Sequence, residues 1–321
     1  TGGTGFIGRR VCRILLERRL PVVILDSQPV ESVLEQLHRS GPAEDLIAVV
    51  KADITDLAQV ESAFRQNPDV TSVIHLASLL TAGVEENLVL AVNVNIVGTV
   101  NILDVAARRG IKRVVQASSE AAYGNSQARY GKRPVREEDF CPPLDHHYAY
   151  GAMKLFNEYM GNKYATNHDM NVACLRPSVV FGFGRGGGGQ SWAEVFATNP
   201  AVGQPATLPF PADNEENWIY VDDCAEQLVR LALKSKLEHY IYNSGGETAS
   251  AAELIAQVKR HLPDADISVD ETQPYTPLID DMDGSRLEHE IDFRPRPLLE
   301  GLRAHIDEAR EATGLPPMAQ G

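Results

Sequence analysis

Short apolar runs alternate with segments of helical periodicity over the first half of the chain. The apolar runs are rich in Val, Ile and Leu and predict buried strands at residues 21–26, 46–50, 72–76, 113–117 and 171–175. Helical patterns lie around them, at residues 9–19, 58–66, 85–109 and 150–167. Strands that alternate with helices form βαβ units, in which the strands lie parallel and helices cover both faces of the sheet. The pattern therefore predicts an α/β fold built on a doubly wound parallel sheet.

The pattern changes after Arg176. Residues 182–211 are rich in glycine and proline and show little periodicity, whereas a helix at 222–237 and a strand at 239–243 predict a return to the sheet. From residue 248 the chain is helical and mixed, and it ends in a polar tail at 315–321. We therefore predict a first domain of residues 1–176 plus 218–246, and a smaller, discontinuous α/β lobe of residues 177–217 plus 247–321.

The composition is that of a globular protein and narrows the choice of partners. Of 321 residues, 43% are hydrophobic and 23% are charged, and the formal net charge is −14. A surface with this much negative charge repels the phosphates of nucleic acids, and we therefore expect no nucleic-acid partner. No apolar run approaches the roughly 18 residues of a membrane span, so we expect no membrane partner either. The four cysteines are far apart in the sequence, which predicts reduced thiols in a cytoplasmic protein.

A glycine-rich loop opens the chain. Three glycines, with an apolar pair before the third, lead directly into the first predicted helix: Gly2, Gly5, Phe6, Ile7 and Gly8. Glycines at this spacing allow a tight turn and a close approach of the backbone to a pyrophosphate, whose charge suits the exposed N–H groups at a helix start. The loop therefore predicts a dinucleotide site.

Asp26 indicates which dinucleotide is bound. It ends the next strand, 18 residues after Gly8. A carboxylate there can accept both hydroxyls of an adenosine ribose and repels a 2′-phosphate, which favours NAD over NADP. Arg9 and Arg10 argue for NADP, but in the first helical turn we expect them to face solvent.

The start of the chain departs from the expected pattern. Thr1 is the first residue, so no strand leads into Gly2. Such a strand belongs in the middle of a doubly wound sheet. We therefore expect the natural protein to have further residues upstream.

Candidate acid/base chemistry lies in the middle of the chain. Tyr150 and Lys154 are four residues apart and therefore share one face of a helix. A lysine cation, together with an oxidised nicotinamide ring, favours the phenolate and lowers a tyrosine pKa that is ordinarily near 10. Ser118 and Ser119 follow the strand at 113–117 directly, at the carboxyl end where ligands bind in open α/β sheets.

Together these residues resemble those of the extended short-chain dehydrogenase/reductases, the NAD-dependent epimerase/dehydratase family. The resemblance covers nearly the whole chain. Its marks are residues 1–8, 53–56, 74–78, 95–99, 118–124, 150–154, 175–182, 220–223 and 283–286. It implies a Rossmann-type NAD-binding domain, here the first of the two predicted domains, with substrate bound by the smaller lobe.

The resemblance also implies roles for individual residues. Tyr150 would be the acid/base, Lys154 would hold the nicotinamide ribose and lower the pKa of Tyr150, and Ser119 would bond the substrate oxygen. The remaining residues that the resemblance assigns to NAD are Asp53 and Ile54 at the adenine, Leu76, Ala77 and Ser78 along the dinucleotide, Asn95, and Pro177 and Val180 at the nicotinamide. Ser78 and Glu120 are further candidates for contact with substrate. The helices at 85–109 and 150–167 would pair two copies into a homodimer through a four-helix bundle.

The substrate end departs from the family pattern. Members acting on nucleotide sugars commonly carry an arginine before the segment Tyr220 to Asp223, where this chain has Glu215 and Glu216, and a second arginine is missing before Asp283. Two acids there repel a diphosphate. We therefore expect an NAD-dependent oxidoreductase that acts on a sugar, sugar acid or other small secondary alcohol. A nucleotide-sugar epimerase is the alternative, and a non-catalytic NAD(H)-binding regulator is a remote third.

Three further motifs suggest nothing beyond this. Glu120 is followed by Ala121 where the dehydratase branch needs an Asp-Glu pair, so we expect no dehydration. The run from Arg185 to Gly189 does not open a helix after a strand, which favours a lid over the substrate rather than a phosphate site. Adjacent His146 and His147 have no third ligand nearby, so we expect no metal site.

Overall fold

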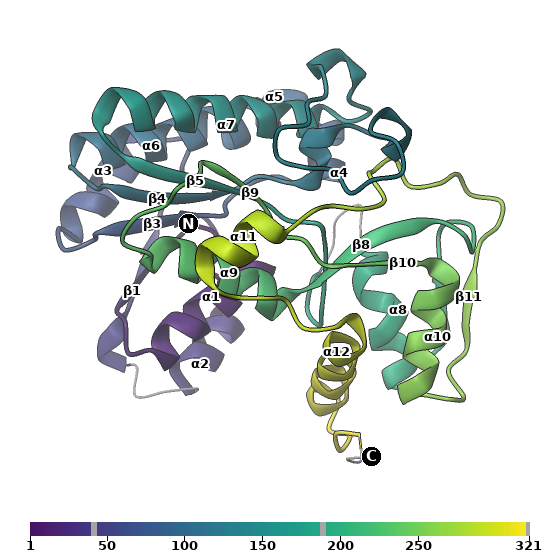
Figure 1. Ribbon diagram of the computed structural model, residues 1–321. Helices are drawn as coiled ribbons and strands as arrows, with labels where there is room; N and C mark the ends of the chain where they lie inside the picture. Colours follow the sequence, from purple (N-terminus) through teal and green to yellow (C-terminus); the bar gives the residue numbers. More distant parts are fainter. Residues whose placement is uncertain (40–43, 187–190, 319–321) are drawn as a thin grey trace.

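The computed structural model describes residues 1–39, 44–186 and 191–318 (Figure 1). Its strands are β1 (Val22–Asp26), β2 (Ile47–Lys51), β3 (Ser72–His75), β4 (Arg113–Ala117), β5 (Asn171–Arg176), β6 (Val179–Phe181), β7 (Ala206–Leu208), β8 (Glu215–Tyr220), β9 (Ile241–Asn243), β10 (Glu247–Ser250) and β11 (Ile267–Val269). Its α-helices are α1 (Phe6–Glu17), α2 (Glu31–Arg39), α3 (Leu57–Gln66), α4 (Thr81–Glu86), α5 (Leu88–Ala91), α6 (Thr99–Arg108), α7 (Ala149–His168), α8 (Trp192–Ala201), α9 (Val221–Leu233), α10 (Ala251–His261), α11 (Ser285–Ile291) and α12 (Leu298–Ala312). A π-helical stretch, η2 (Val92–Gly98), joins α5 to α6, and a short 3₁₀ helix, η3 (Glu120–Tyr123), follows β4.

The predicted parallel sheet is confirmed. β3, β4, β5 and β9 pair in that order, all parallel, and β1 pairs parallel with β2. The first residues of the chain lie between β1 and β3, because the Thr1 amino group donates to Ile74 O (2.8 Å) and the Gly2 N–H donates to Leu25 O (3.0 Å). Helices α3, α6 and α7 cover one face of the sheet, and α1 and α9 cover the other (Figure 1).

A second, smaller sheet forms the centre of the other part of the molecule. In it β8 pairs antiparallel with β10 and parallel with β6, while β7 pairs with β11 nearby. β8 therefore belongs to this sheet and β9 to the first, and the predicted domain boundary at residue 218 falls inside β8. The division into two domains stays a prediction.

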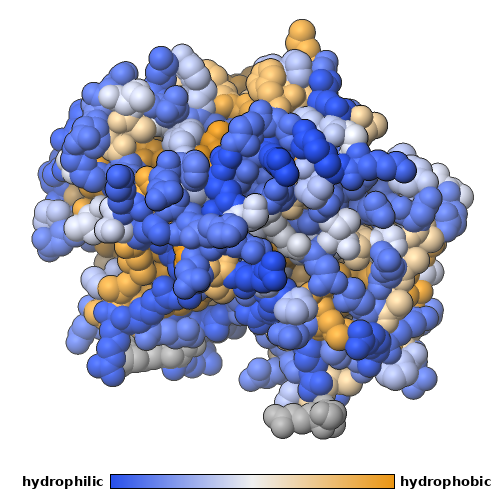
Figure 2. All heavy atoms as spheres, in the orientation of Figure 1, coloured by the Kyte–Doolittle hydropathy of each residue, from blue (hydrophilic) through white to orange (hydrophobic). Residues whose placement is uncertain are grey.

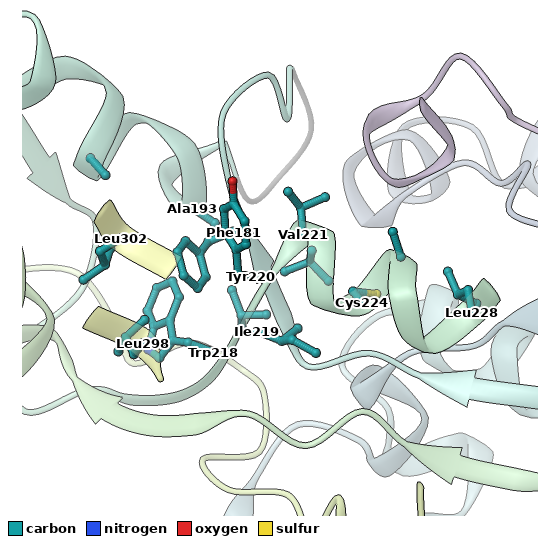
Figure 3. Packing of buried hydrophobic residues seen from close by; sticks show 14 of the residues in the cluster. Phe181, Ala193, Trp218, Ile219, Tyr220, Val221, Cys224, Leu228, Leu298 and Leu302 are labelled. Carbon is teal, nitrogen blue, oxygen red and sulfur yellow. The ribbon is translucent and has the colours of Figure 1, made fainter. Parts of the chain in front are cut away.

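One hydrophobic core continues beneath both sheets. Trp218, Ile219 and Tyr220 of β8 run directly into Val221 of α9, and Figure 3 shows their side chains in one cluster with Leu302 of α12. The same cluster includes the strand residues Val115, Ala173 and Leu175 of the first sheet. Because protein interiors are close-packed, this shared core fixes the second sheet against the first.

Several helices depart from the sequence pattern. The helix predicted at 85–109 is interrupted at Asn87, whose side chain caps α5 by accepting the Leu90 N–H (2.9 Å). α2 was not predicted, and α8 lies in the stretch judged aperiodic. α8 shows no clear apolar stripe because it is largely buried, so apolar residues occur around most of its circumference.

The run Leu88–Arg108 is helical throughout and, by length and composition alone, apolar enough to span a membrane, with a mean hydropathy of 1.8. It is the one such helix in the described residues, and the expectation that no apolar run approaches that length was therefore wrong by this criterion. A core helix passes the same criterion, and Ile102, Leu103 and Ala106 are buried in a core beneath the first sheet. The face seen in Figure 2 is mostly hydrophilic, with apolar side chains gathered at its upper edge, over α5 and α7.

Candidate active site

A cleft of about 1010 Å³ lies at the carboxyl ends of the parallel strands. Its floor comes from the loops that follow β1 to β5, and its far wall includes residues 273–278 of the smaller lobe. Open α/β sheets bind their ligands at this edge, because the strand ends and helix starts leave backbone groups available there. The cleft gathers nearly all the residues that the sequence singled out.

The glycine loop forms the turn that the sequence predicted. Gly2 has φ +66°, and a Cβ on it would lie 3.0 Å from Ala77 N. A Cβ on Gly8 would lie 2.1 Å from Gly2 O, so no larger residue fits at either position. α1 begins at Phe6, so Gly8 lies in its first turn, and its N-cap, Gly5, offers no side chain to the first N–H groups. These N–H groups are therefore placed to bind a pyrophosphate. The cleft is lined by all the predicted loop residues, Gly2, Gly5, Phe6, Ile7 and Gly8.

Asp26 is held at the end of β1 with its carboxylate in the cleft. One oxygen accepts the Thr4 hydroxyl (2.7 Å) and the Thr4 N–H (3.2 Å), and the other accepts the Gln28 N–H (3.1 Å). The oxygen that accepts only the Gln28 N–H keeps a lone pair for a ribose hydroxyl, whereas a 2′-phosphate would meet a negative charge. Together with the open start of α1, this donor and acceptor set fits NAD.

Arg9 and Arg10 do not face solvent as expected. The Arg9 guanidinium donates to the carbonyls of Phe183 and Gly184 (both 2.8 Å), and Arg10 pairs with Glu308 of α12. The two guanidinium groups can be partly buried beside the smaller lobe because carbonyl and carboxylate oxygens there accept the hydrogen bonds that water would otherwise accept. Both arginines therefore tie α1 to the smaller lobe, and this bonding gives no support for NADP.

The adenine side of the cleft matches the predicted residues with one exception. Asp53 and Ile54 line it, as do Leu76, Ala77 and Ser78. Asn95 does not line the cleft. Its buried amide accepts the Leu79 N–H (2.7 Å) and donates to Leu79 O (2.9 Å), so it holds the loop after Ser78 in place.

Tyr150, Lys154 and Ser119 meet at the centre of the cleft. Tyr150 and Lys154 lie one turn apart at the start of α7, and the Lys154 ammonium is 5.3 Å from the centre of the Tyr150 ring. The ammonium also donates to Ala117 O at the end of β4 (2.8 Å). The Ser119 hydroxyl is hydrogen-bonded to the Tyr150 side chain. The three groups whose roles the resemblance implied are therefore in one place.

Two close contacts fix α7 against the sheet. Glu158 accepts both Arg176 Nε and Nη2 of β5 (2.7 Å each) and the Ser118 hydroxyl (2.5 Å), all buried. A Cβ on Gly151 would lie 2.2 Å from Ala121 O, so only glycine lets the first turn of α7 approach η3 this closely. These contacts set the position of Tyr150 relative to Ser119.

The pKa of Tyr150 is raised, to about 12, rather than lowered. Burial is the main cause, and nearby Glu120 adds to it, while the hydrogen bond from Ser119 and the charge of Arg185 act in the opposite direction. Burial also lowers the pKa of Lys154, to about 8, against the charge of Glu158. Desolvation of the phenolate therefore outweighs the hydrogen bond from Ser119 and the charge of Arg185.

The nicotinamide end includes predicted and unpredicted residues. Pro177, Val180, Ser119 and Glu120 line the cleft as expected. Arg185 also lines it, with its guanidinium 5.7 Å from the centre of the Phe6 ring and donating to Val180 O. The sequence placed Arg185 in a possible lid. The sequence does carry a signal for its place in the cleft, because Arg185 is the one charged residue in a run of glycines.

The other side of the cleft comes from residues that no motif marked. Residues 273–278 line it and were noted only for lacking an arginine. Gly187 to Gly189 of the predicted lid lie outside the described residues.

Among the described residues no group of three His, Cys, Asp or Glu side chains could hold a metal. His146 is hydrogen-bonded to the carbonyls of Pro142 and Ala122 instead (both 3.2 Å).

Comparisons with known proteins agree with this geometry. The NAD dependent epimerase/dehydratase family matches residues 1–245. The chain is 28% identical over 274 residues to the mitochondrial L-threonine 3-dehydrogenase of Bos taurus, covering 84% of this chain and 69% of that protein. It is 26% identical over 271 residues to D-erythronate dehydrogenase of Cupriavidus necator, covering 81% and 80%. The structure of Thermus thermophilus UDP-glucose 4-epimerase in complex with NAD matches with a TM-score of 0.78 at 26% identity, over 97% of this chain and 98% of that one.

Proposed function

Since the chain belongs to the NAD-dependent epimerase/dehydratase family, whose members are extended short-chain dehydrogenase/reductases, we propose that it is a dehydrogenase that oxidises a small secondary alcohol and releases the product with NADH. The substrate is a sugar, a sugar acid or another small hydroxylated molecule without a nucleotide. The observation that carries this proposal is the chemistry of the substrate end of the cleft, where Glu120 lines the wall and Thr276, which also lines it, donates to the fully buried Glu216. Carboxyl groups in this place supply none of the charge-assisted donors that bind a diphosphate.

The site residues supply the proton chemistry. Tyr150 takes the proton of the substrate hydroxyl, and the Ser119 hydroxyl hydrogen-bonds the same oxygen and orients it. Lys154 contributes a positive charge beside the phenol and reaches the ribose side of the cleft. The open start of α1 and Asp26 bind the two ends of the adenosine diphosphate moiety. NAD, when bound, supplies the acceptor for the hydride that leaves the carbon carrying the hydroxyl.

The names of two relatives support a small substrate. They are dehydrogenases of L-threonine and of D-erythronate, hydroxy acids that carry no nucleotide. A second candidate, a nucleotide-sugar epimerase, is favoured by the similarity to UDP-glucose 4-epimerase over nearly the whole chain. An epimerase returns the hydride to the opposite face of the same carbon, so it produces no net NADH.

NADH absorbance separates the two candidates. The purified protein is incubated with NAD and a panel of sugars, sugar acids and other secondary alcohols, and in parallel with UDP-glucose. We expect net NADH with at least one small alcohol and no isomerisation of UDP-glucose. Isomerisation without net NADH, and no oxidation of any small alcohol, would contradict the proposal.

The assembly that we propose is a homodimer. Apolar side chains on α5, η2 and α7 are exposed, among them Val89 (75%), Val92, Phe156 and Tyr159. Such a contiguous apolar surface on neighbouring helices marks a protein contact, and a second copy presents the same surface.

We also propose that the protein works in a reducing compartment, the cytoplasm, because all four cysteines are free and buried. Cell fractionation tests the compartment, and recovery of the protein only from an oxidising compartment would contradict it.

A further inference from the structure

The helix that carries Tyr150 begins without a cap from its own N-cap residue. The first N–H groups of a helix have no partner inside it, and a Ser, Thr, Asn or Asp side chain at the N-cap usually accepts one of them. The N-cap of α7 is Tyr148, whose side chain makes no such bond. Tyr148 instead lines the cleft, and its ring packs edge-on against His147 with 4.4 Å between the ring centres. The first turn of α7 therefore depends on acceptors from other segments or from water.

Glu85 of α4 supplies one of these acceptors. Glu85 Oε1 accepts the Ala149 N–H at 2.9 Å, and Ala149 is the residue directly before Tyr150. The two bonded residues are 64 positions apart in the sequence and belong to different helices. A carboxylate acceptor makes the bond charge-assisted, and its negative charge suits the positive end of the helix dipole. The bond therefore ties α4 to the first turn of α7.

Packing holds the backbone of α4 in place beneath this bond. Val84 is 0% exposed and shares a hydrophobic cluster with Tyr150, and α4 lies against α7 (Figure 1). With the backbone already ordered, the bond costs only the rotamer freedom of the Glu85 side chain. The first turn of α7 is thus held by two segments, by η3 at Gly151 and by α4 at Ala149.

We propose that Glu85 is a positioning residue for Tyr150: it fixes the start of α7, and through it the phenol beside Ser119. Glu85 also lines the cleft, but its bond to Ala149 assigns it to the helix rather than to the substrate. The role requires an acceptor oxygen at this position and no charge on it. The inference rests on the proposed function, because oxidation and epimerisation alike use Tyr150 as the acid/base.

Two variants of Glu85 separate the acceptor from the charge. Glu85→Ala removes the acceptor, and we expect kcat to fall by about three- to tenfold with KM changed by less than about twofold, because a misplacement of about 1 Å can cost about 10²-fold. Glu85→Gln keeps an amide oxygen that accepts the same N–H, so its kcat should stay within about twofold of that of the unchanged protein. Glu86→Ala is the matched control, because Glu86 is the next residue of α4, is exposed and does not line the cleft.

The kinetic outcomes that overturn the inference are distinct. A raised KM with unchanged kcat in Glu85→Ala would make Glu85 a residue that contacts the substrate. An equal loss of kcat in Glu85→Gln and Glu85→Ala would show that the charge matters and not the acceptor. Unchanged kcat and KM in Glu85→Ala would show that α7 keeps its place without the bond.

Hydrogen exchange tests the tie between α4 and α7 without any substrate. We expect the Ala149 amide to exchange faster by about tenfold or more in Glu85→Ala than in Glu86→Ala, because it has lost its acceptor. The melting temperature of each variant shows that it folds. Equal exchange in the two variants overturns the inference and leaves the proposed function intact. If the unchanged protein neither forms NADH nor isomerises UDP-glucose, the proposed function fails, whereas faster exchange in Glu85→Ala alone still supports the tie.

Discussion

Tyr150 illustrates how strongly the surroundings of a single residue control its chemistry. Its spacing from Lys154 is a local property of a helix, and the structure places the ammonium 5.3 Å from the ring. Its pKa depends on burial, on Ser119 and Glu120 after β4, and on Arg185 from a distant segment of the chain. The spacing could be predicted from the sequence, but the balance of these four effects could not.

We expect Tyr150→Phe to lower turnover by about 10²- to 10⁴-fold, the usual contribution of general acid–base catalysis. NAD affinity should change little, because the glycine loop and Asp26 are untouched. Steady-state kinetics and NADH-fluorescence titration measure the two effects. Tyr164→Phe, near the other end of α7, is the control and should retain activity. Turnover near that of the unchanged protein in Tyr150→Phe would refute the assignment of the acid/base.

The raised pKa of Tyr150 sets the direction of the pH dependence. Oxidation needs the phenolate, so its rate should rise with pH from about 6 to about 9, by at most about tenfold per unit. Reduction needs the protonated phenol, which is already present throughout this range because the pKa is about 12. Its rate should show no such rise. Initial rates in both directions across the range check the prediction, which an oxidation rate that falls with pH would contradict.

At the scale of elements, α7 carries the acid/base pair and is positioned by close packing. Its first turn approaches η3 through Gly151, and its middle is tied to β5 by the buried pair of Glu158 and Arg176. Such a pair stabilises the arrangement only while both partners are present, because a lone buried charge is costly. The element therefore has one position, and the distance from Tyr150 to Ser119 depends on it.

Gly151→Ala tests the close approach of α7. The added Cβ would lie 2.2 Å from Ala121 O and 2.5 Å from His146 Cδ2, so the helix must shift. We expect kcat to fall by about tenfold or more, since a misplacement of about 1 Å can cost about 10²-fold. Gly83→Ala in α4 is the control, because its Cβ meets only ordinary contacts at 3.7 Å. Steady-state kinetics and thermal melting are measured for both variants. Equal activities would show that the position of Tyr150 on α7 does not depend on this contact.

The elements differ in how much of them the sequence reveals. Strands β3, β4 and β5 agree with the predicted runs nearly residue for residue, because strands buried in a parallel sheet have apolar residues next to each other at their centres, as Val114 and Val115 are in β4. α8 and the short strand β7 lie in the stretch 182–211, which shows little periodicity. They take their structure from packing around Trp218, which local pattern does not report.

At the scale of the whole molecule, the cleft is a product of two sheets that share one core. The loops after the strands of the first sheet supply the cofactor groups, and residues 273–278, which follow β11, line the substrate end. The ion pair of Arg10 with Glu308 and the bonds from Arg9 to residues 183 and 184 join the two parts beside α1.

The proposed homodimer gives a prediction at this scale. Phe156→Glu places a charge on the exposed apolar surface of α7 and should shift the protein from dimer to monomer, because a buried, unpaired charge disfavours the contact. Light scattering on a size-exclusion column measures the mass. Leu144→Glu is the control, because Leu144 is exposed but lies outside these helices. A monomeric mass for the unchanged protein would refute the dimer.

By itself the sequence determined the parallel sheet, the glycine turn, the carboxylate of Asp26 and the shared helix face of Tyr150 and Lys154. All of these depend on residues that are close in the chain, so periodicity and backbone conformation reveal them. Only the tertiary structure decided the raised pKa of Tyr150, the place of Arg185 and the supporting role of Asn95. These depend on desolvation and on contacts between distant segments, which arise only when the chain excludes water and packs.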